Sequence, residues 1–234
     1  EDYLYVSQLL QARGMKTAIE AHRRAKPYCM GTLYWQFNDC WPVTSWSSLD
    51  YYGNWKAFHY QAKRSFENLL LSVNEENEIY KVFLVNDNFE SYSVRLELEL
   101  LSFDGKSLWE NSKEVTVKEN TSINVYEIPK DEFEKFDLKS SVLKVNWEEV
   151  KINYFFAKPK DLKLQKPNIE IKIINDFMIE ISSDVLAKDV FLSSENEVFF
   201  EDNYFDLLPN DKRIIKLSKA AKEIKVKSLF DTIK

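Results

Sequence analysis

The stretch YCMGTLYWQFNDCWPVTSWSSLDYYGNWK, residues 28–56, decides how the rest of the sequence is interpreted. Its first part, residues 28–37, is a nearly continuous apolar run of strand length, which is typical of a strand buried on both faces in a parallel sheet. A polar and aromatic segment, residues 38–53, follows it, and loops of this length are uncommon without a functional reason. The stretch therefore predicts a buried strand that leads into a functional loop.

Helical patterns flank this stretch on both sides. The upstream helix has an apolar stripe with spacings of three and four and ends at Pro27. That stripe consists of Tyr5, Leu9, Ala12, Met15 and Ile19. Downstream, Asn54 is the expected N-cap of a second helix, whose stripe consists of Trp55, Phe58, Ala62 and Phe66. Helix, strand, loop and helix make one and a half units of an α/β fold, so the remaining strands of the sheet must lie outside this sequence. In α/β barrels, the loops after the strands build the active site.

From Leu69 onward the apolar period changes to that of strands. In residues 94–100, apolar and charged residues alternate strictly, and Asp104 and Gly105 predict a tight hairpin turn. Short strands continue on both sides of a proline-containing linker near residue 159. The sequence therefore predicts an α/β segment followed by all-β structure, with domains at residues 1–68, 69–158 and 159–234, the last two being β-sandwiches.

Charge and composition exclude several classes of partner. The 234 residues carry a net charge of -6, so no basic field for phosphates is available and no nucleic-acid partner is expected. No apolar run approaches the roughly 18 residues of a membrane-spanning helix, so no membrane partner is expected. Up to Phe66 there are eight Lys or Arg against five Asp or Glu, and beyond it 24 against 33. This change in charge supports a boundary near residue 68.

Residues 28–56 hold four of the six tryptophans, with Asn, Asp, Gln and Ser between them. Sugar rings present flat C–H faces and hydroxyl groups, and a sugar site therefore needs aromatic faces beside hydrogen-bonding groups. The alternative is that these tryptophans fill a core under the loop, which suits Trp41 and Trp55 best. At the carboxyl end of the expected strand, Trp35, Asn38 and Asp39 are best placed to reach a ligand, although Asn38 and Asp39 are also common turn residues.

Other chemistries find little support in the same stretch. Asp39 and Asp50 are its only carboxylates, so a two-carboxylate glycosidase mechanism is not assembled here. There is no G-x-S-x-G motif and no glycine-rich phosphate loop. Cys29 and Cys40, taken with the two histidines, match no zinc spacing, and we expect them to be reduced, buried thiols. The sequence predicts no cofactor and no metal.

Residues 34–60, YWQFNDCWPVTSWSSLDYYGNWKAFHY, closely resemble the end of the catalytic barrel of family 2 β-mannosidases. In that family, a tryptophan on the last barrel strand opens the signature WQ-x-NDCWP-x-x-SWS-x-x-DY-x-G-x-WK. The resemblance extends back through SQLLQARG, residues 7–14. More weakly, it extends forward to VFLSSENEVFFEDNYFDLLP, residues 190–209.

The resemblance implies the terminal helix-strand-helix segment of a (β/α)8 barrel followed by two immunoglobulin-like β-sandwiches. It implies a retaining exo-glycosidase that removes terminal β-mannose from oligosaccharides or glycoconjugates through a covalent glycosyl-enzyme. Both catalytic glutamates would lie upstream of residue 1, in the remainder of the same enzyme chain, so this chain alone should be inactive. By position, Trp35 would lie under the terminal mannose, while Asn38, Asp39 and Trp46 would shape or support the pocket.

Three alternatives remain open at this point. A family 2 enzyme could cleave β-galactosides, β-glucuronides or β-glucosaminides instead, although the NDCWP motif favours mannose. The two sandwiches could form a non-catalytic carbohydrate-binding module, but the aromatic cluster lies outside them. The chain could also be a separate subunit that completes its site with a partner chain.

Overall fold

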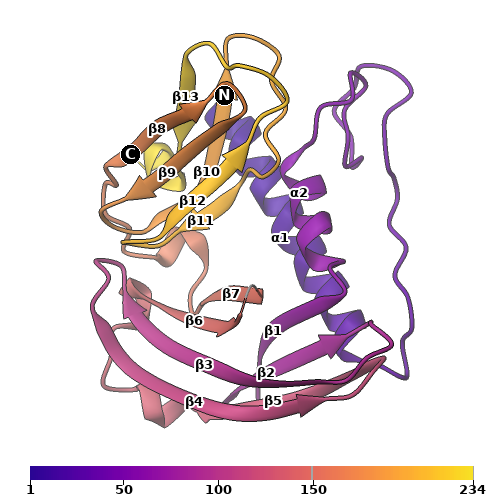
Figure 1. Ribbon diagram of the computed structural model, residues 1–234, viewed down its shortest axis with the longest axis vertical. Coiled ribbons are helices and arrows are strands. Elements are labelled where there is room, and N and C mark those ends of the chain that lie inside the picture. The colour runs from indigo at the N-terminus through magenta and orange to yellow at the C-terminus, as the bar shows by residue number, and fades with distance from the viewer. Residues whose placement is uncertain (149, 234) are drawn as a thin grey trace.

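The computed structural model describes residues 1–148 and 150–233, in which two α-helices lie beside two β-sandwiches (Figure 1). The helices are α1 (Asp2–Arg24) and α2 (Ala57–Ser65), and neither is long and apolar enough to cross a bilayer. The apolar stripe predicted for the first helix is present in α1, where Ala12 and Ile19 pack with Phe58 of α2. The two helices are therefore held together by a small core of their own.

The first sandwich consists of two antiparallel sheets packed face to face. One sheet has the order β1-β2-β5, with β1 (Leu69–Glu76), β2 (Ile79–Asn86) and β5 (Thr121–Pro129). The other has the order β4-β3-β6-β7, with β4 (Ser107–Val117), β3 (Tyr92–Ser102), β6 (Ser141–Trp147) and β7 (Val150–Phe155). The predicted alternation is confirmed in β3, whose four aliphatic side chains at residues 94, 96, 98 and 100 are buried.

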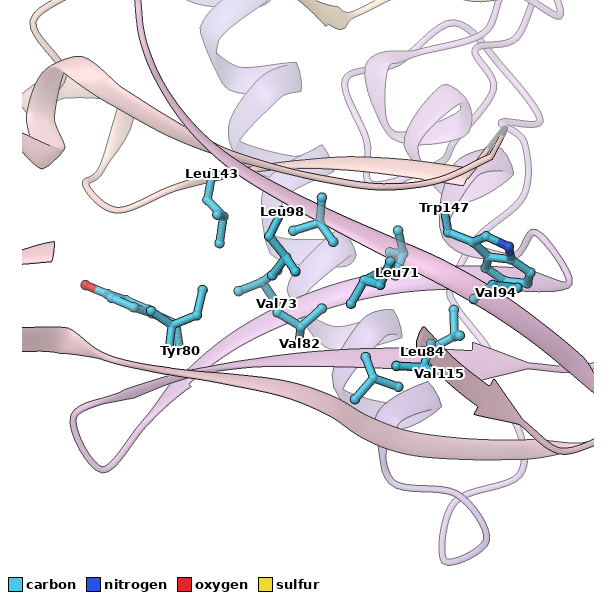
Figure 2. Close-up of a cluster of buried hydrophobic side chains, with 14 of the residues drawn as sticks. Leu71, Val73, Tyr80, Val82, Leu84, Val94, Leu98, Val115, Leu143 and Trp147 are labelled. Atoms are coloured by element: carbon cyan, nitrogen blue, oxygen red, sulfur yellow. The ribbon is translucent and has the colours of Figure 1, made fainter. Parts of the chain in front are cut away.

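The core of this sandwich is formed by side chains from both sheets (Figure 2). Leu71 and Leu84 from one sheet meet Leu98 and Leu143 from the other, and Trp147 closes one end. Each large aliphatic side chain removed from water in this way contributes roughly 1.5–3 kcal/mol. This burial explains why the short alternating strands assemble as two layers.

The second sandwich is smaller. One of its sheets has the order β12-β9-β8, with β8 (Ile169–Asn175), β9 (Met178–Ser183) and β12 (Lys212–Lys216). The other has the order β11-β10-β13, with β10 (Ala187–Ser194), β11 (Phe205–Leu207) and β13 (Ile224–Lys227). Its core contains Ile179, Ile181, Val190, Leu192 and Phe205. The predicted run of short strands is thus present in the C-terminal part of the chain.

The two sandwiches are joined by a third apolar cluster. Phe103, Leu186 and Leu208 are buried in it, and the Leu186 amide donates to the Phe103 carbonyl at 2.8 Å. Gly105, in the β3–β4 turn, adopts a positive φ of 87°, and a Cβ there would lie 2.9 Å from Cβ of Pro209. A glycine is therefore required both by the turn and by the close approach of the second sandwich.

The helix α1 contacts both sandwiches along its length (Figure 1). Near its start, the Tyr5 hydroxyl donates to the Asp189 carbonyl of the second sandwich. Near its end, Arg23 forms an ion pair with Asp87 of the first sandwich at 3.0 Å and donates to the Ser65 carbonyl. The helix α1 is therefore tied to both β domains.

The buried strand predicted for residues 28–37 is wrong for this structure. Those residues are extended but form no strand, and Leu33 is fully exposed. The nearest ladder contacts are isolated bridges that link Leu49 to Asn38 and to Trp55. A strand buried on both faces needs neighbours on both edges, and residues 1–148 and 150–233 place none beside this segment.

The predicted start of the second helix also needs correction. The N-cap position of α2 is Lys56, and Trp55 lies before the helix. Asn54 instead forms part of a turn, where its backbone amide and its side-chain amide both donate to the Asp50 carboxylate, at 2.8 and 2.9 Å. Asn54 is part of this turn and not the helix cap, because Asp side chains readily accept from nearby backbone amides.

The predicted state of the thiols is correct only in part. Both cysteines are free, but Cys40 is exposed and Cys29 is half-buried. The expectation of buried thiols was therefore wrong. It assumed the buried strand and covered loop that this structure does not contain.

Candidate functional site

The extended segment that contains Trp35 has two different sides. From residue 32 to residue 37, half-buried and exposed side chains alternate. Tyr34 lies on the covered side and meets Phe58 of α2 edge to face, with ring centroids 4.8 Å apart. Trp35 lies on the other side and is 76% exposed. The segment therefore rests on α2 and presents its largest aromatic face outward.

The alternation ends at the loop. Asn38 is exposed, whereas Asp39 is only 4% exposed. Alternation along a strand would place residues 35 and 39 on the same side, but Asp39 does not face outward with Trp35. Asn38 donates to the neighbouring carbonyl only weakly, at 3.5 Å. Its side-chain amide remains available to a ligand, while Asp39 has turned into the loop.

Asp39 is the centre of a polar network inside the loop. Its Oδ1 accepts from the Ser45 hydroxyl at 2.6 Å, its Oδ2 accepts from the Ser47 hydroxyl at 2.6 Å, and Lys56 Nζ lies 3.3 Å from Oδ2. These hydrogen bonds, with that from Ser45 first, lower the pKa of the Asp39 carboxyl to about 2. The carboxylate is thus ionised and fully engaged, which suits a support for the loop rather than a proton donor.

Trp46 lies between the two serines that bind Asp39. Its side chain is 62% exposed, while its backbone carbonyl accepts from Gln11 Nε2 of α1 at 2.7 Å. The network therefore places Trp46 and Asp39 in one folded loop, and Trp35 and Asn38 on the segment that leads into it. Ser45 and Ser47 were not singled out from the sequence, although their placement on either side of Trp46 was a usable signal.

A second network joins the loop to α2. Ser48 Oγ lies 2.9 Å from Nδ1 of His59 and 3.2 Å from the Tyr34 hydroxyl, and it donates to the Phe37 carbonyl at 2.9 Å. Burial lowers the pKa of His59, which favours its neutral form. His59 is therefore a packed histidine that contacts the loop through Ser48.

The chain matches two family models over most of its β structure. A model described as a mannosidase Ig/CBM-like domain matches residues 78–161, and a mannosidase model described as an Ig-fold domain matches residues 164–232. The β-mannosidase of Capra hircus is 32% identical over 82% of this chain and 24% of its own length. The β-mannosidase B of Thermothelomyces thermophilus is 28% identical over 98% of this chain and 31% of its own length.

Comparison with solved structures also finds similarity to a β-mannosidase. The β-D-mannosidase of Dictyoglomus thermophilum superposes with a TM-score of 0.85 and 30% identity, over 97% of this chain and 29% of that chain. The chain corresponds to the C-terminal portion of the family 2 β-mannosidases. An exo-chitosanase of Amycolatopsis orientalis, at 14% identity and a TM-score of 0.74, shares the fold.

This β-mannosidase portion spans between about a quarter and a third of the length of the relatives named above. Both matched domain models begin after residue 77, so Trp35, Asn38, Asp39 and Trp46 all precede them. The candidate site is therefore outside the immunoglobulin-like β-mannosidase domains.

Proposed function

We propose that this chain supplies part of the sugar-binding pocket of a retaining exo-β-mannosidase that hydrolyses terminal, non-reducing β-D-mannose residues. In this proposal, residues 1–68 are the last helix-strand-helix segment of a (β/α)8 barrel. Residues 69–158 and 159–234 are its two following immunoglobulin-like domains. Both catalytic glutamates belong to the remainder of the same enzyme chain, and the substrates are β-mannoside oligosaccharides or glycoconjugates.

The observation that carries the proposal is the outward face of Trp35 at the end of an extended, unpaired segment. An aromatic side chain that is 76% exposed beside the exposed Asn38 offers the flat apolar surface and the hydrogen-bonding group that a pyranose ring requires. Among the described residues, the carbonyls of residues 36 and 37 accept from the amides of Ser48 and Leu49, while the backbone of residues 32–35 forms no backbone hydrogen bond and is available to neighbouring strands of a barrel.

Each remaining site residue has a defined role in the proposal. Asp39 supports the pocket, because its carboxylate already accepts from Ser45 and Ser47 and pairs with Lys56. Trp46 shapes the pocket rim, because the same loop holds its backbone while its ring stays exposed. Trp35 stacks under the sugar, and Asn38 donates to a hydroxyl group.

A panel of chromogenic glycosides tests the proposal on the complete enzyme. We expect hydrolysis of an aryl β-mannoside and little or no hydrolysis of the β-galactoside, β-glucuronide and β-glucosaminide. The 234-residue chain alone should turn over none of them, because the acid/base and nucleophile pair required by the mechanism is absent from its site. Preference for another glycoside, or measurable turnover by the isolated chain, would overturn the proposal.

A further inference from the structure

The loop between β10 and β11 of the second sandwich reaches back to the candidate site. In this loop, Phe199 meets Trp55 edge to face, with ring centroids 4.9 Å apart. Trp55 in turn meets His59 at 4.2 Å, and His59 meets Phe37 at 5.6 Å. A continuous chain of ring contacts therefore joins the last domain to the segment that carries Trp35.

Hydrogen bonds follow the same route. His59 Nδ1 lies 2.9 Å from Ser48 Oγ, and Ser48 donates to the carbonyl of Phe37. The Leu49 amide also donates to that carbonyl at 2.9 Å, and Leu49 forms bridges to both Asn38 and Trp55. Trp55 is therefore connected, through His59 and Leu49, to the backbone that carries Asn38.

The β10–β11 loop is anchored on two sides. The buried Asn203 side chain accepts from the Leu192 amide at 2.8 Å and donates to the Leu192 carbonyl at 2.9 Å, which ties the loop to β10. On the other side, Arg64 of α2 pairs with Asp202 at 2.6 Å, and the Tyr60 hydroxyl donates to the Phe200 carbonyl at 3.0 Å. The loop is fixed to its own sandwich and to α2 at once.

We propose that Phe199 is a positioning residue for the sugar site, acting through Trp55 and His59 on the Phe37–Asn38 backbone. The inference rests on the proposed function for its catalytic consequence, whereas the coupling itself is a property of this chain. Within the part of the chain that the structure describes, the ring contacts of Phe199 are with Trp55 and Tyr60, and we place neither of these against the sugar, so its effect is indirect. It gives the last sandwich a role in positioning the site.

The first test uses NMR on the 234-residue chain with Phe199→Ala, Phe199→Tyr and Phe177→Ala. Phe177 is an exposed phenylalanine in the β8–β9 turn of the same sandwich and is the matched control. We expect Phe199→Ala to shift the ring signals of His59 and the amide signals of Asn38 and Leu49. Phe199→Tyr keeps the ring and should restore them, Phe177→Ala should leave them in place, and His22 is the internal reference. Unchanged His59 and Asn38 signals in a folded Phe199→Ala chain would overturn the inference.

The second test measures kcat and KM of the complete enzyme with the same three variants. Phe199→Ala should lower kcat/KM for an aryl β-mannoside about tenfold, because small misplacements of a positioned sugar are costly. Phe199→Tyr should restore it, and Phe177→Ala should not change it. Normal kcat/KM in Phe199→Ala would overturn the inference while the proposed function stands. A wild-type enzyme inactive on mannosides would overturn the proposed function, and the NMR signals would still decide the coupling.

Discussion

Residues 25–56 and the first sandwich are built by opposite means. In the sandwich, long antiparallel ladders satisfy the backbone, and aliphatic side chains from both sheets fill a closed core (Figure 2). In residues 25–56, isolated bridges and side-chain hydrogen bonds hold the backbone, and large aromatic side chains remain exposed. The core of the sandwich is closed by its own two sheets, whereas residues 25–56 are held by contacts with α2 and with the second sandwich.

The largest expected effect is on the free energy of unfolding, when a leucine is replaced by alanine in each of the two regions. Leu98→Ala, in the sandwich core, should lower the free energy of unfolding by about 2–5 kcal/mol, because it leaves a cavity among packed side chains. Leu33→Ala, at a fully exposed position of the loop region, should change it by no more than about 0.5 kcal/mol. Urea unfolding of the two variants gives both values. Similar losses in both variants would contradict the contrast.

A smaller effect tests whether the two sandwiches form one unit. Gly105→Ala should cost about 1–3 kcal/mol, because alanine is strained at a φ of 87° and its Cβ would press on Pro209. Gly14→Ala is the control, since nothing lies within 4 Å of a Cβ there in the middle of α1, and it should stabilise by about 0.5–1 kcal/mol. Thermal unfolding of both variants tests this. A neutral Gly105→Ala would show that the turn relaxes away from Pro209.

The pH dependence of the loop gives a still smaller and local effect. The pKa of Asp39 is lowered from 3.8 to about 2, so its hydrogen bonds stabilise the loop fully above the unfolded value and are lost as the pH falls toward 2. We expect tryptophan fluorescence to report loosening of the loop between about pH 4 and pH 2. Asp39→Asn should remove that transition. A transition that persists in Asp39→Asn would assign the pH dependence to other carboxyl groups.

The sequence predicted the β domains well, because their signal is local. The strict alternation at residues 94–100 reports one buried face, and the structure places those side chains in the core. In the loop region the same reasoning failed. An apolar run such as residues 28–37 predicts a buried strand, but a strand forms only where neighbouring strands are present to pair with it. Asn54 was expected to cap the second helix, but its backbone amide donates to Asp50 instead.

The supports of the candidate site were the least predictable part. Hydrogen bonds from Ser45 and Ser47 to Asp39 depend on the path of the folded loop, which no periodicity encodes. The contact between Trp55 and Phe199 joins residues that are distant in sequence and arises only when the second sandwich docks on α2. The sequence could indicate individual candidate site residues, but it could not indicate which side chains would contact them in the folded protein.

The most direct test of the proposed sugar site compares Trp35 with Trp147, one tryptophan from each region. In the complete enzyme, Trp35→Ala should lower kcat/KM for an aryl β-mannoside about tenfold or more while the Tm stays near that of the wild type, because stacking and orientation are lost without a cavity. Trp147→Ala should instead lower stability by about 3–5 kcal/mol and leave the kcat/KM of the folded enzyme unchanged. A steep fall in Tm for Trp35→Ala with normal kcat/KM in the remaining folded enzyme would show that Trp35 is a core residue, and it would contradict the sugar site.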